Sequence, residues 1–435
     1  MKLFVYLLLL SINTQSHMKH LKRFICLYFF ITMVLCFSFS LSAQIIKRTY
    51  SVISGYIVDE TNEEPLIYAN ISVPNTNIGM VTNDDGKFLL KIPDSVAVKK
   101  ITVSHIGYKS FSFLFSKGEV EEIRIRLVPA VTNLKEVIVR VPDVRGILNE
   151  AILKIKENYS NTNNILTGFY RETIEKRNHF ISISEAVTGV YKQKYRSGGY
   201  EDRTEVYKGR RILSQKTHDT IAVKLIGGPN IAIYADIVKN RDLLLSSDMI
   251  ENYSYSFEKF ISIDKRPQYV IAFVPRVITP YALYTGILYI DKESLAITRA
   301  IFHLDMKDKK KATEMILKKK PSGLHFDPIK VGFVVTYEAG PDGRTYLRYI
   351  RNEIYFKCDW KRRFFATKYD VISEMVITDL KKTDRPIPWR RTFRSYQSLT
   401  DKVEDFGDPD FWEDYNILEP TETLDKAVNR LKKKR

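Results

Sequence analysis

Short runs of alternating apolar and polar residues follow one another from Tyr50 to Arg140. Glycine, asparagine, aspartate and proline separate these runs, a combination that is typical of strands joined by tight turns. We expect strands at 51–58, 69–73, 79–82, 87–92, 100–104 and 121–127. A succession of short strands of this kind predicts a β-sandwich.

The turn between two of these strands contains Asp84, Asp85 and Gly86. Asp-Gly supplies the positive φ that a hairpin turn requires, and aspartate side chains accept hydrogen bonds from nearby backbone amides. A calcium loop of the EF-hand type needs a glutamate at its twelfth position. Counting from Asn77 or from Asn83, no glutamate falls there. The pattern favours a turn, with a metal site as the alternative.

The pattern changes after residue 142. Asp143 can cap a helix that runs to about Tyr159, with one apolar face that should pack against a sheet. Further strands are expected at 167–173, 179–184, 268–273, 286–290, 296–304 and 346–355. A short turn at 291–295 indicates an antiparallel meander. We therefore predict a mainly β protein, with a sandwich at 50–140 and an α+β domain at 143–435 in which a half-barrel antiparallel sheet packs on helices.

Two basic, apolar runs precede the sandwich, at Met1–Leu10 and Met18–Ala43. The second has the anatomy of a signal peptide: basic residues, an apolar core and a small-residue stretch that ends at Ala43. We interpret residues 1–43 as a signal peptide region with its true start at Met18; a retained transmembrane helix is the alternative. Removal of this region would leave Cys358 as the sole cysteine.

The chain is strongly basic, because 68 lysines and arginines outnumber 51 acidic residues by 17. The leader contains four of the cations and no acid, so the excess without it is 17 − 4 = 13. An exported protein of this charge meets anionic lipid head groups and polysaccharides before nucleic acid. Basic runs at 307–311, 318–320 and 430–435 are either solvated faces or lipid-adhesive surfaces. The acidic, aromatic stretch at 401–414 could neutralise a basic face of the same molecule.

No motif for catalysis is present. None of the histidines after the leader has a glutamate three residues on, as a zinc carboxypeptidase would need, and the serine-elbow, P-loop and dinucleotide motifs do not occur. His303 with Asp305 and His325 with Asp327 could each present a metal-binding pair, but chance produces this spacing on strands. Cys358 is interpreted as packing. We predict no catalytic, metal or cofactor-binding residue, no cofactor and no enzyme activity.

The sandwich also resembles a known family. The residues that carry the resemblance lie in four motifs, in order: Gly55-x-Ile57-Val58-Asp59, Pro65-Leu66-x-x-Ala69-x-Ile71, Gly79-x-x-Thr82-Asn83-x-x-Gly86-x-Phe88 and Val103-Ser104-x-x-Gly107-Tyr108. Together they are similar to the carboxypeptidase-regulatory-like domain, a transthyretin-like sandwich of Bacteroidetes envelope proteins. The resemblance implies an accessory domain without catalytic residues, in which the motif positions are turns and core anchors.

Three further stretches carry weaker resemblances. Residues 134–139 resemble the segment that joins this domain to the plug of TonB-dependent outer-membrane receptors, although a receptor barrel of roughly 22 strands of about ten residues needs more chain than follows. The pair 286–290 and 296–302 is similar to the central hairpin of the periplasmic lipoprotein-carrier family. Phe169–Glu172 and Ser184–Val187 resemble uncharacterised Bacteroidetes proteins.

These observations predict a non-enzymatic cell-envelope protein in the periplasm or outer membrane. We expect its curved sheet, lined by some of the 26 tyrosines and 24 phenylalanines, to bind a hydrophobic, lipid or glycan ligand or a partner protein. Outer-membrane lipids, glycans and a TonB-dependent-type receptor are the expected partners, and nucleic acid is not. The alternatives are a structural or assembly factor associated with outer-membrane receptors, and then a hydrolase.

Overall fold

The computed structural model describes residues 50–116, 119–130, 142–195, 202–216, 225–263, 266–317, 322–360, 366–405 and 411–433. The expected signal peptide and residues 134–139 lie outside these ranges. The stretch Tyr50–Arg435 forms one unit by its internal contacts.

Seven described strands build the predicted sandwich. One sheet has the order β4-β1-β7 and the other the order β3-β2-β5-β6. Alternation places Ile53, Ile57, Phe88, Leu90 and Val103 in a core where each is fully buried. The strands are β1 (Tyr50–Asp59), β2 (Asn70–Ser72), β3 (Gly79–Val81), β4 (Lys87–Pro93), β5 (Lys100–Ser104), β6 (Phe111–Leu114) and β7 (Glu119–Leu127).

The Asn83–Gly86 segment is a turn, as predicted, and Gly86 has a φ of 71°. It does not close a hairpin, because β3 and β4 belong to different sheets and the turn carries the chain from one sheet to the other. The side chain that accepts hydrogen bonds from the backbone amides of this turn also differs from the prediction. The Asn83 side chain, not an aspartate, accepts from the backbone N–H groups of Asp85 and Lys87, both at 2.9 Å.

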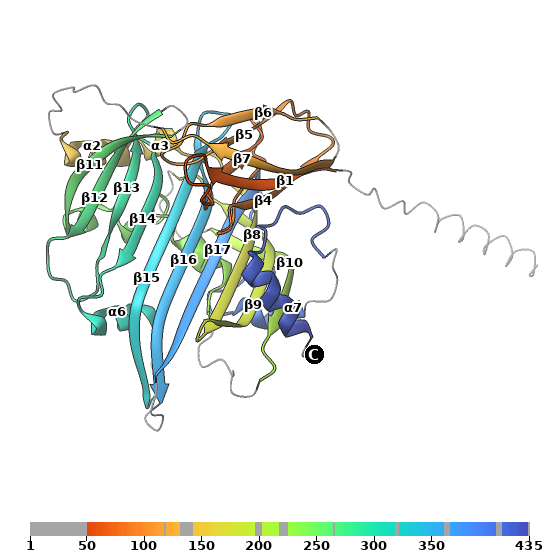
Figure 1. Ribbon diagram of the computed structural model, residues 1–435. Helices are drawn as coiled ribbons and strands as arrows, with labels where there is room; N and C mark the ends of the chain where they lie inside the picture. The colour runs from red at the N-terminus through yellow and green to blue at the C-terminus, as the bar shows by residue number, and fades with distance from the viewer. Residues whose placement is uncertain are drawn as a thin grey trace, which may run out of the picture. The chain divides into compact units, whose positions relative to one another are not determined.

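A large antiparallel meander follows, and the predicted fold class is confirmed. Its described strands have the order β11-β12-β13-β14-β15-β16-β17-β8-β9-β10-β18, with a parallel pairing only between β10 and β18 (Figure 1). The strands are β8 (Asn164–Lys176), β9 (His179–Lys192), β10 (Arg203–Leu213), β11 (Tyr253–Ile263), β12 (Arg266–Pro275), β13 (Tyr284–Asp291), β14 (Ile297–Leu304), β15 (Leu324–Ala339), β16 (Thr345–Trp360), β17 (Thr367–Lys382) and β18 (Glu404–Asp405).

The helices are short, and none in the described ranges is long and apolar enough to cross a bilayer. Asp143 caps the first one as predicted, accepting from the N–H of Gly146, but the expected helix to Tyr159 is broken at Lys154 into two. The helices are α2 (Val144–Leu153), α3 (Ile155–Asn158), α4 (Pro229–Tyr234), α5 (Ser247–Ile250), α6 (Lys309–Ile316) and α7 (Glu422–Lys432), with 3-10 turns η2 (Arg241–Leu243) and η3 (Leu399–Asp401).

The middle of the large sheet is covered on both faces. Successive side chains of a strand point to opposite faces, and on β8 Phe169 joins the core of the sandwich while Tyr170 joins the core under the helices. The same division occurs on β9, β16 and β17. On the helix side, buried residues between α4 and α5 fill the space, including Ile237, Val238 and Leu244. The expected ligand cleft over these strands is therefore occupied by the chain itself.

The C-terminal segment joins the sandwich to the sheet. Trp412 and Leu418 are buried in the sandwich core. The Asn416 side chain makes two hydrogen bonds with the backbone of Lys91, at 2.6 and 2.9 Å. On the sheet side, the Arg171 guanidinium donates to the carbonyl of Leu418 at 2.7 Å. This segment therefore contacts both layers at once.

Candidate functional site

The two histidine and aspartate pairs do not come together. His303 lies on β14 opposite Gly332 of β15, whereas His325 lies seven residues earlier on β15. A strand rises about 3.3 Å per residue, so the two imidazoles are roughly 20 Å apart. His325 lies 4.0 Å from Asp359, and Asp327 is paired with Lys309 at 2.6 Å. Within the described ranges, no group of three or more histidine, cysteine or acidic side chains could hold a metal ion.

Cys358, interpreted from the sequence as a packing residue, is a buried residue of β16. It lies in an apolar cluster with Phe326, Phe356 and Tyr369. Asp84 and Asp85, the candidate calcium ligands, point to different partners. Asp84 accepts from the Tyr68 hydroxyl at 2.8 Å, and Asp85 accepts from the backbone of α7 at 2.7 Å.

The acidic, aromatic segment contacts basic residues of β10, consistent with the expected neutralisation. Asp405 pairs with Arg211 at 3.3 Å, and Glu413 pairs with Lys208 at 3.0 Å. The basic run at 307–311 enters α6, whereas 318–320 lies outside the described residues.

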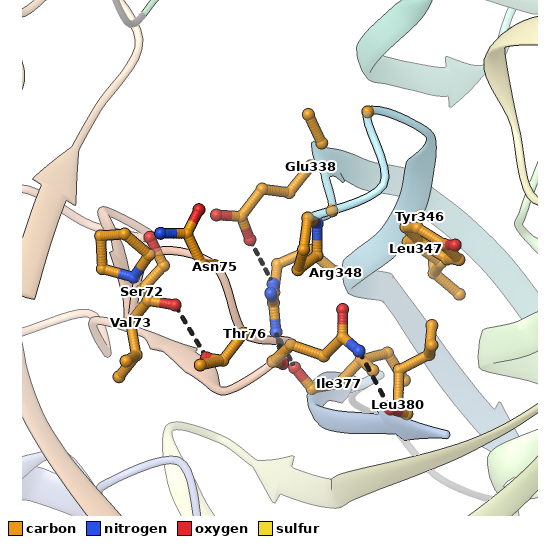
Figure 2. A pocket seen from close by; sticks show the side chains of 16 residues that line it. Ser72, Val73, Asn75, Thr76, Glu338, Tyr346, Leu347, Arg348, Ile377 and Leu380 are labelled. Carbon is orange, nitrogen blue, oxygen red and sulfur yellow. Dashed lines mark hydrogen bonds and ion pairs between the residues drawn. The ribbon is translucent and has the colours of Figure 1, made fainter. Parts of the chain in front are cut away.

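A pocket of about 310 Å³ lies where the β2–β3 turn meets the hairpin of β15 and β16. Figure 2 shows Arg348 at its centre, reaching between Glu338 and the backbone of Ile377. The guanidinium donates to Glu338 at 2.5 Å and to the carbonyl of Ile377 at 2.7 Å. Asn77 donates to the carbonyl of Leu380 at 3.1 Å. These groups already satisfy one another, so we interpret this junction pocket as a structural joint.

A second pocket, of about 250 Å³, contains a network of charged groups. Arg351 donates to Glu374 at 2.9 Å and to Glu353 at 2.8 Å, and lies 3.5 Å from Asp84. Burial raises the pKa of Asp84, and the charge of Arg351 opposes that shift. Perturbed pKa values occur in structural ion-pair networks as well as in active sites. Here Arg351 is the shared partner of Asp84, Glu353 and Glu374, which again indicates a joint.

A third pocket, of about 530 Å³, differs because it is basic and aromatic. We call it the basic pocket. One wall is β10, another is the 390–397 segment, and Val403 of the chain leading into β18 closes it. A Cβ atom at Gly209 would lie 2.4 Å from Val403, so glycine is what allows β10 and this segment to approach. The other lining residues are Val206, Tyr207, Lys208, Arg390, Arg391, Thr392, Phe393, Gln397, Lys402, Glu404 and Phe411.

The cations of the basic pocket fall into two groups. Arg391 makes two hydrogen bonds with Glu205, at 2.6 and 2.7 Å, which raise the pKa of its guanidinium and keep it charged. Lys208 pairs with Glu413. In contrast, no carboxylate in the described ranges pairs with Arg390 or Lys402. Both residues are exposed.

Aromatic side chains also line the basic pocket, and one of them, Tyr207, is 42% exposed. Phe411 lies under Lys208, with the ammonium nitrogen 4.6 Å from the ring centroid. Trp389 and Tyr396 are 59% and 72% exposed, but they adjoin the lining residues in sequence and do not line the pocket themselves. Arg203 stacks on the Trp389 ring at 4.0 Å from its centroid. Flat apolar rings beside charged donors can stack on a ligand while the donors bind its acidic groups.

No prediction from the sequence pointed to this pocket. A signal was present, because basic and aromatic residues are interleaved in 385–396, "RPIPWRRTFRSY". The contribution of β10 and Lys402 had no such signal, since it depends on the pairing of β18 with β10.

Comparisons with known proteins confirm the resemblance of the sandwich. Residues 53–139 match the model of the CarboxypepD_reg-like domain family, which accounts for about a fifth of the chain. No curated protein matches the sequence significantly.

Solved structures with a similar arrangement include three that each match a little over half of this chain. A DUF1329 family protein from Desulfovibrio piger has a TM-score of 0.23 and 13% identity over 56% of this chain and 95% of its own. A LolA superfamily protein from Nitrosomonas europaea has a TM-score of 0.21 and 11% identity over 57% and 99%. MucB in complex with MucA(peri) has a TM-score of 0.17 and 12% identity over 56% and 100%. At these scores the similarities support no inference about function.

Proposed function

We propose that the protein is a non-enzymatic cell-envelope protein that binds an anionic glycan at the basic pocket. The observation that carries the proposal is one pocket that combines two cations, Arg390 and Lys402, for which the described residues supply no carboxylate partner, with the exposed ring of Tyr207. Sugar rings have apolar faces that stack on aromatic side chains, and an arginine binds carboxylate or phosphate groups in a bidentate manner.

Titration calorimetry with an acidic oligogalacturonate and a neutral maltohexaose tests this proposal. The acidic oligosaccharide should bind and the neutral one should not. Arg390→Ala and Lys402→Ala should each lower the affinity about tenfold, because a hydrogen bond to a charged group contributes about 1.5–3 kcal/mol. Lys381→Ala is the control, since this exposed lysine lies on β17 away from the pocket. Equal affinity in all three variants would contradict the assignment.

The absence of catalysis is tested with the same ligand. Mass spectrometry after prolonged incubation should find the oligogalacturonate intact, since the pocket lacks an acid and base pair placed for glycosidic cleavage among its described residues. Shortened products that disappear in the Lys402→Ala variant would instead assign a hydrolase.

We also propose that residues 1–43 direct export, and that the mature chain carries an accessory sandwich at 50–140 and a binding domain at 143–435. The basic, apolar and small-residue order of the leader supports export. N-terminal sequencing of the native protein from fractionated cells should give Gln44 in the envelope fraction. A cytoplasmic protein with an intact leader would overturn this part.

An assembly role is the second candidate, and strand β6 favours it. β6 is an edge strand of the sandwich, with Phe111 and Leu114 exposed. Exposed apolar edges can pair with a strand of another protein. If this candidate holds, Leu114→Lys should release a co-purifying envelope protein, whereas Arg390→Ala should retain it.

A further inference from the structure

The loop between β12 and β13 presents apolar side chains to solvent. Ile278 at its tip is 96% exposed, and Val277 and Tyr281 beside it are also exposed. Val274 at the end of β12 and Met315 of α6 are exposed as well. We call these five residues the apolar tip. Single exposed apolar residues are common, but several on one projecting loop indicate a surface that contacts something apolar.

The loop is fixed rather than loosely attached. Ala282 and Leu283 are buried in the core under the helices. At the other end, Arg276 donates to the carbonyl of Glu251 at 2.6 Å and pairs with its carboxylate at 3.1 Å. Thr279 donates to the carbonyl of Tyr281 at 2.6 Å. Burial of the base and exposure of the tip place Ile278 outward.

Helix α6 places lysines next to this tip. The Lys311 ammonium donates to the carbonyl of Thr279 at 2.7 Å, which joins the helix to the loop. Figure 1 shows α6 and the β12–β13 connection at the same end of the sheet. Residues 307–311 contain four lysines and one aspartate, and Asp308 is used as the helix cap.

The lysines beside the tip are only partly neutralised. Lys309 pairs with Asp327 at 2.6 Å, but both side chains are substantially exposed, so the pair is weak. For Lys307 and Lys310, no carboxylate partner occurs within the described part of the chain. The tip therefore has positive charge at its base and apolar groups at its end.

We propose that this end of the sheet docks on the surface of an anionic phospholipid bilayer, with Ile278 inserted among the head groups. Apolar residues that enter the interface and lysines that face anionic head groups are the two components of reversible membrane attachment. The basic pocket is formed by β10, near the opposite end of the strand order from β12 and β13. The inference is therefore independent of the proposed ligand site.

Vesicle co-sedimentation of the full chain tests the proposal. Vesicles of phosphatidylglycerol and phosphatidylcholine should bind the protein more tightly than vesicles of phosphatidylcholine alone. The double change Lys307→Glu with Lys310→Glu should weaken binding at least about tenfold, because each cation near an anionic surface contributes about 1 kcal/mol. Ile278→Asp should weaken binding to a similar extent, because it replaces the inserted apolar group by an anion. Raising the salt concentration should weaken wild-type binding in the same direction.

Matched controls distinguish binding through the apolar tip from non-specific adsorption through other apolar or basic surface residues. Leu114→Asp changes an equally exposed apolar residue, 87% exposed, on the sandwich edge. Lys381→Glu with Lys382→Glu reverses two exposed lysines of β17. Both controls should bind like wild type. If the tip variants bind at wild-type strength, the proposal is overturned. This holds also where the leader is what attaches the protein to the vesicles.

A spectroscopic readout reports insertion directly. Ile278→Trp should show a blue shift of its added emission with anionic vesicles, and none with neutral vesicles. The three native tryptophans contribute a background that the wild-type spectrum subtracts. The contrary result is an emission that stays unshifted under conditions where the protein sediments with vesicles. That result would also overturn the proposal, because another part of the protein, such as the basic pocket, would then hold the vesicle.

Discussion

Strand β1 lies so close to β7 at Gly55 that no side chain fits between them. A Cβ atom built on Gly55 would lie 2.0 Å from the carbonyl oxygen of Ile123, at a register shift between the two strands. Backbone cannot move aside as a flexible side chain can. Gly55→Ala should therefore destabilise the protein by about 3 kcal/mol, the upper end for overpacking. Denaturant unfolding measures this free energy.

Gly332→Ala is the matched control for that change. Gly332 also lies in a strand, β15, but its nearest neighbour would be the end of the Lys330 side chain at 3.3 Å. A flexible lysine can shift, so we expect a change within about 1 kcal/mol. Equal losses in the two variants would show that the close approach at Gly55 is not what limits the site.

Glu172 makes stability depend on pH. It is buried on β8, where it accepts from the Tyr170 hydroxyl at 3.0 Å and from Thr400 at 3.2 Å. Burial raises its pKa from 4.5 to about 7, and these hydrogen bonds oppose the shift. The folded state therefore binds a proton that the unfolded state releases between pH 4.5 and 7. The contribution of this group to stability falls as the pH rises through that window.

Glu172→Gln should remove this pH dependence. The shift of about 2.5 pH units corresponds to roughly 3 kcal/mol at most. Urea unfolding at pH 5 and pH 7.5 should show that wild type loses more stability over this interval than the glutamine variant. Other carboxylates contribute equally to both proteins, so the difference isolates Glu172. Parallel pH profiles would contradict the assignment.

At the scale of single elements, helix α7 covers the outer part of β9 and β10. Leu424 and Leu431 pack on Ile183 and Ile212, which are fully buried. Leu424→Ala should cost about 2–4 kcal/mol, because the cavity lies between a helix and a sheet that cannot close it fully. Asn429→Ala, on the exposed side of α7, should change stability little. Thermal unfolding of both variants measures the difference.

A strand is easier to predict from the sequence when only one of its faces is buried. β4 has one buried face, and its alternation predicted it within a residue. β9 is buried on both faces over most of its length, so its periodicity is lost beyond Ser184 and its second half was not expected. β15 contains Pro328 beside a bulge, which interrupts its pattern, and it was missed. The local alternation of apolar and polar residues shows that one face of a strand is buried. Whether the other face is also covered depends on contacts with elements distant in sequence.

The candidate site follows the same rule. The 385–396 segment is recognisable by its composition, but Lys208 and Lys402 join it only through the pairing of β10 with β18. The two histidine pairs had a suitable local spacing, yet the register of β14 on β15 separates them. Strand register depends on turn geometry and on which face of each strand is buried, and the local spacing within each histidine pair carries neither.

At the scale of the whole described unit, the sandwich and the large sheet share one core. Phe169, Val187, Tyr349 and Val376 of the sheet belong to the same apolar cluster as the sandwich residues. Tyr349 stacks on Tyr68 of the sandwich with ring centroids 4.8 Å apart, and its hydroxyl donates to Glu374 at 2.7 Å. A shared core predicts that the two layers unfold together rather than one after the other.

Calorimetry should therefore give a single transition for the wild-type protein, and Tyr349→Ala should divide it. The change removes a fully buried ring and leaves Glu374 with one donor fewer, so we expect a loss of about 3–5 kcal/mol. Hydrogen exchange should show sandwich amides opening before those of β8 and β17. Tyr355→Ala is the control, because this half-buried tyrosine lies on the same strand outside the shared core. Two transitions in wild type, with Tyr349→Ala affecting only one, would show that the layers are energetically separate.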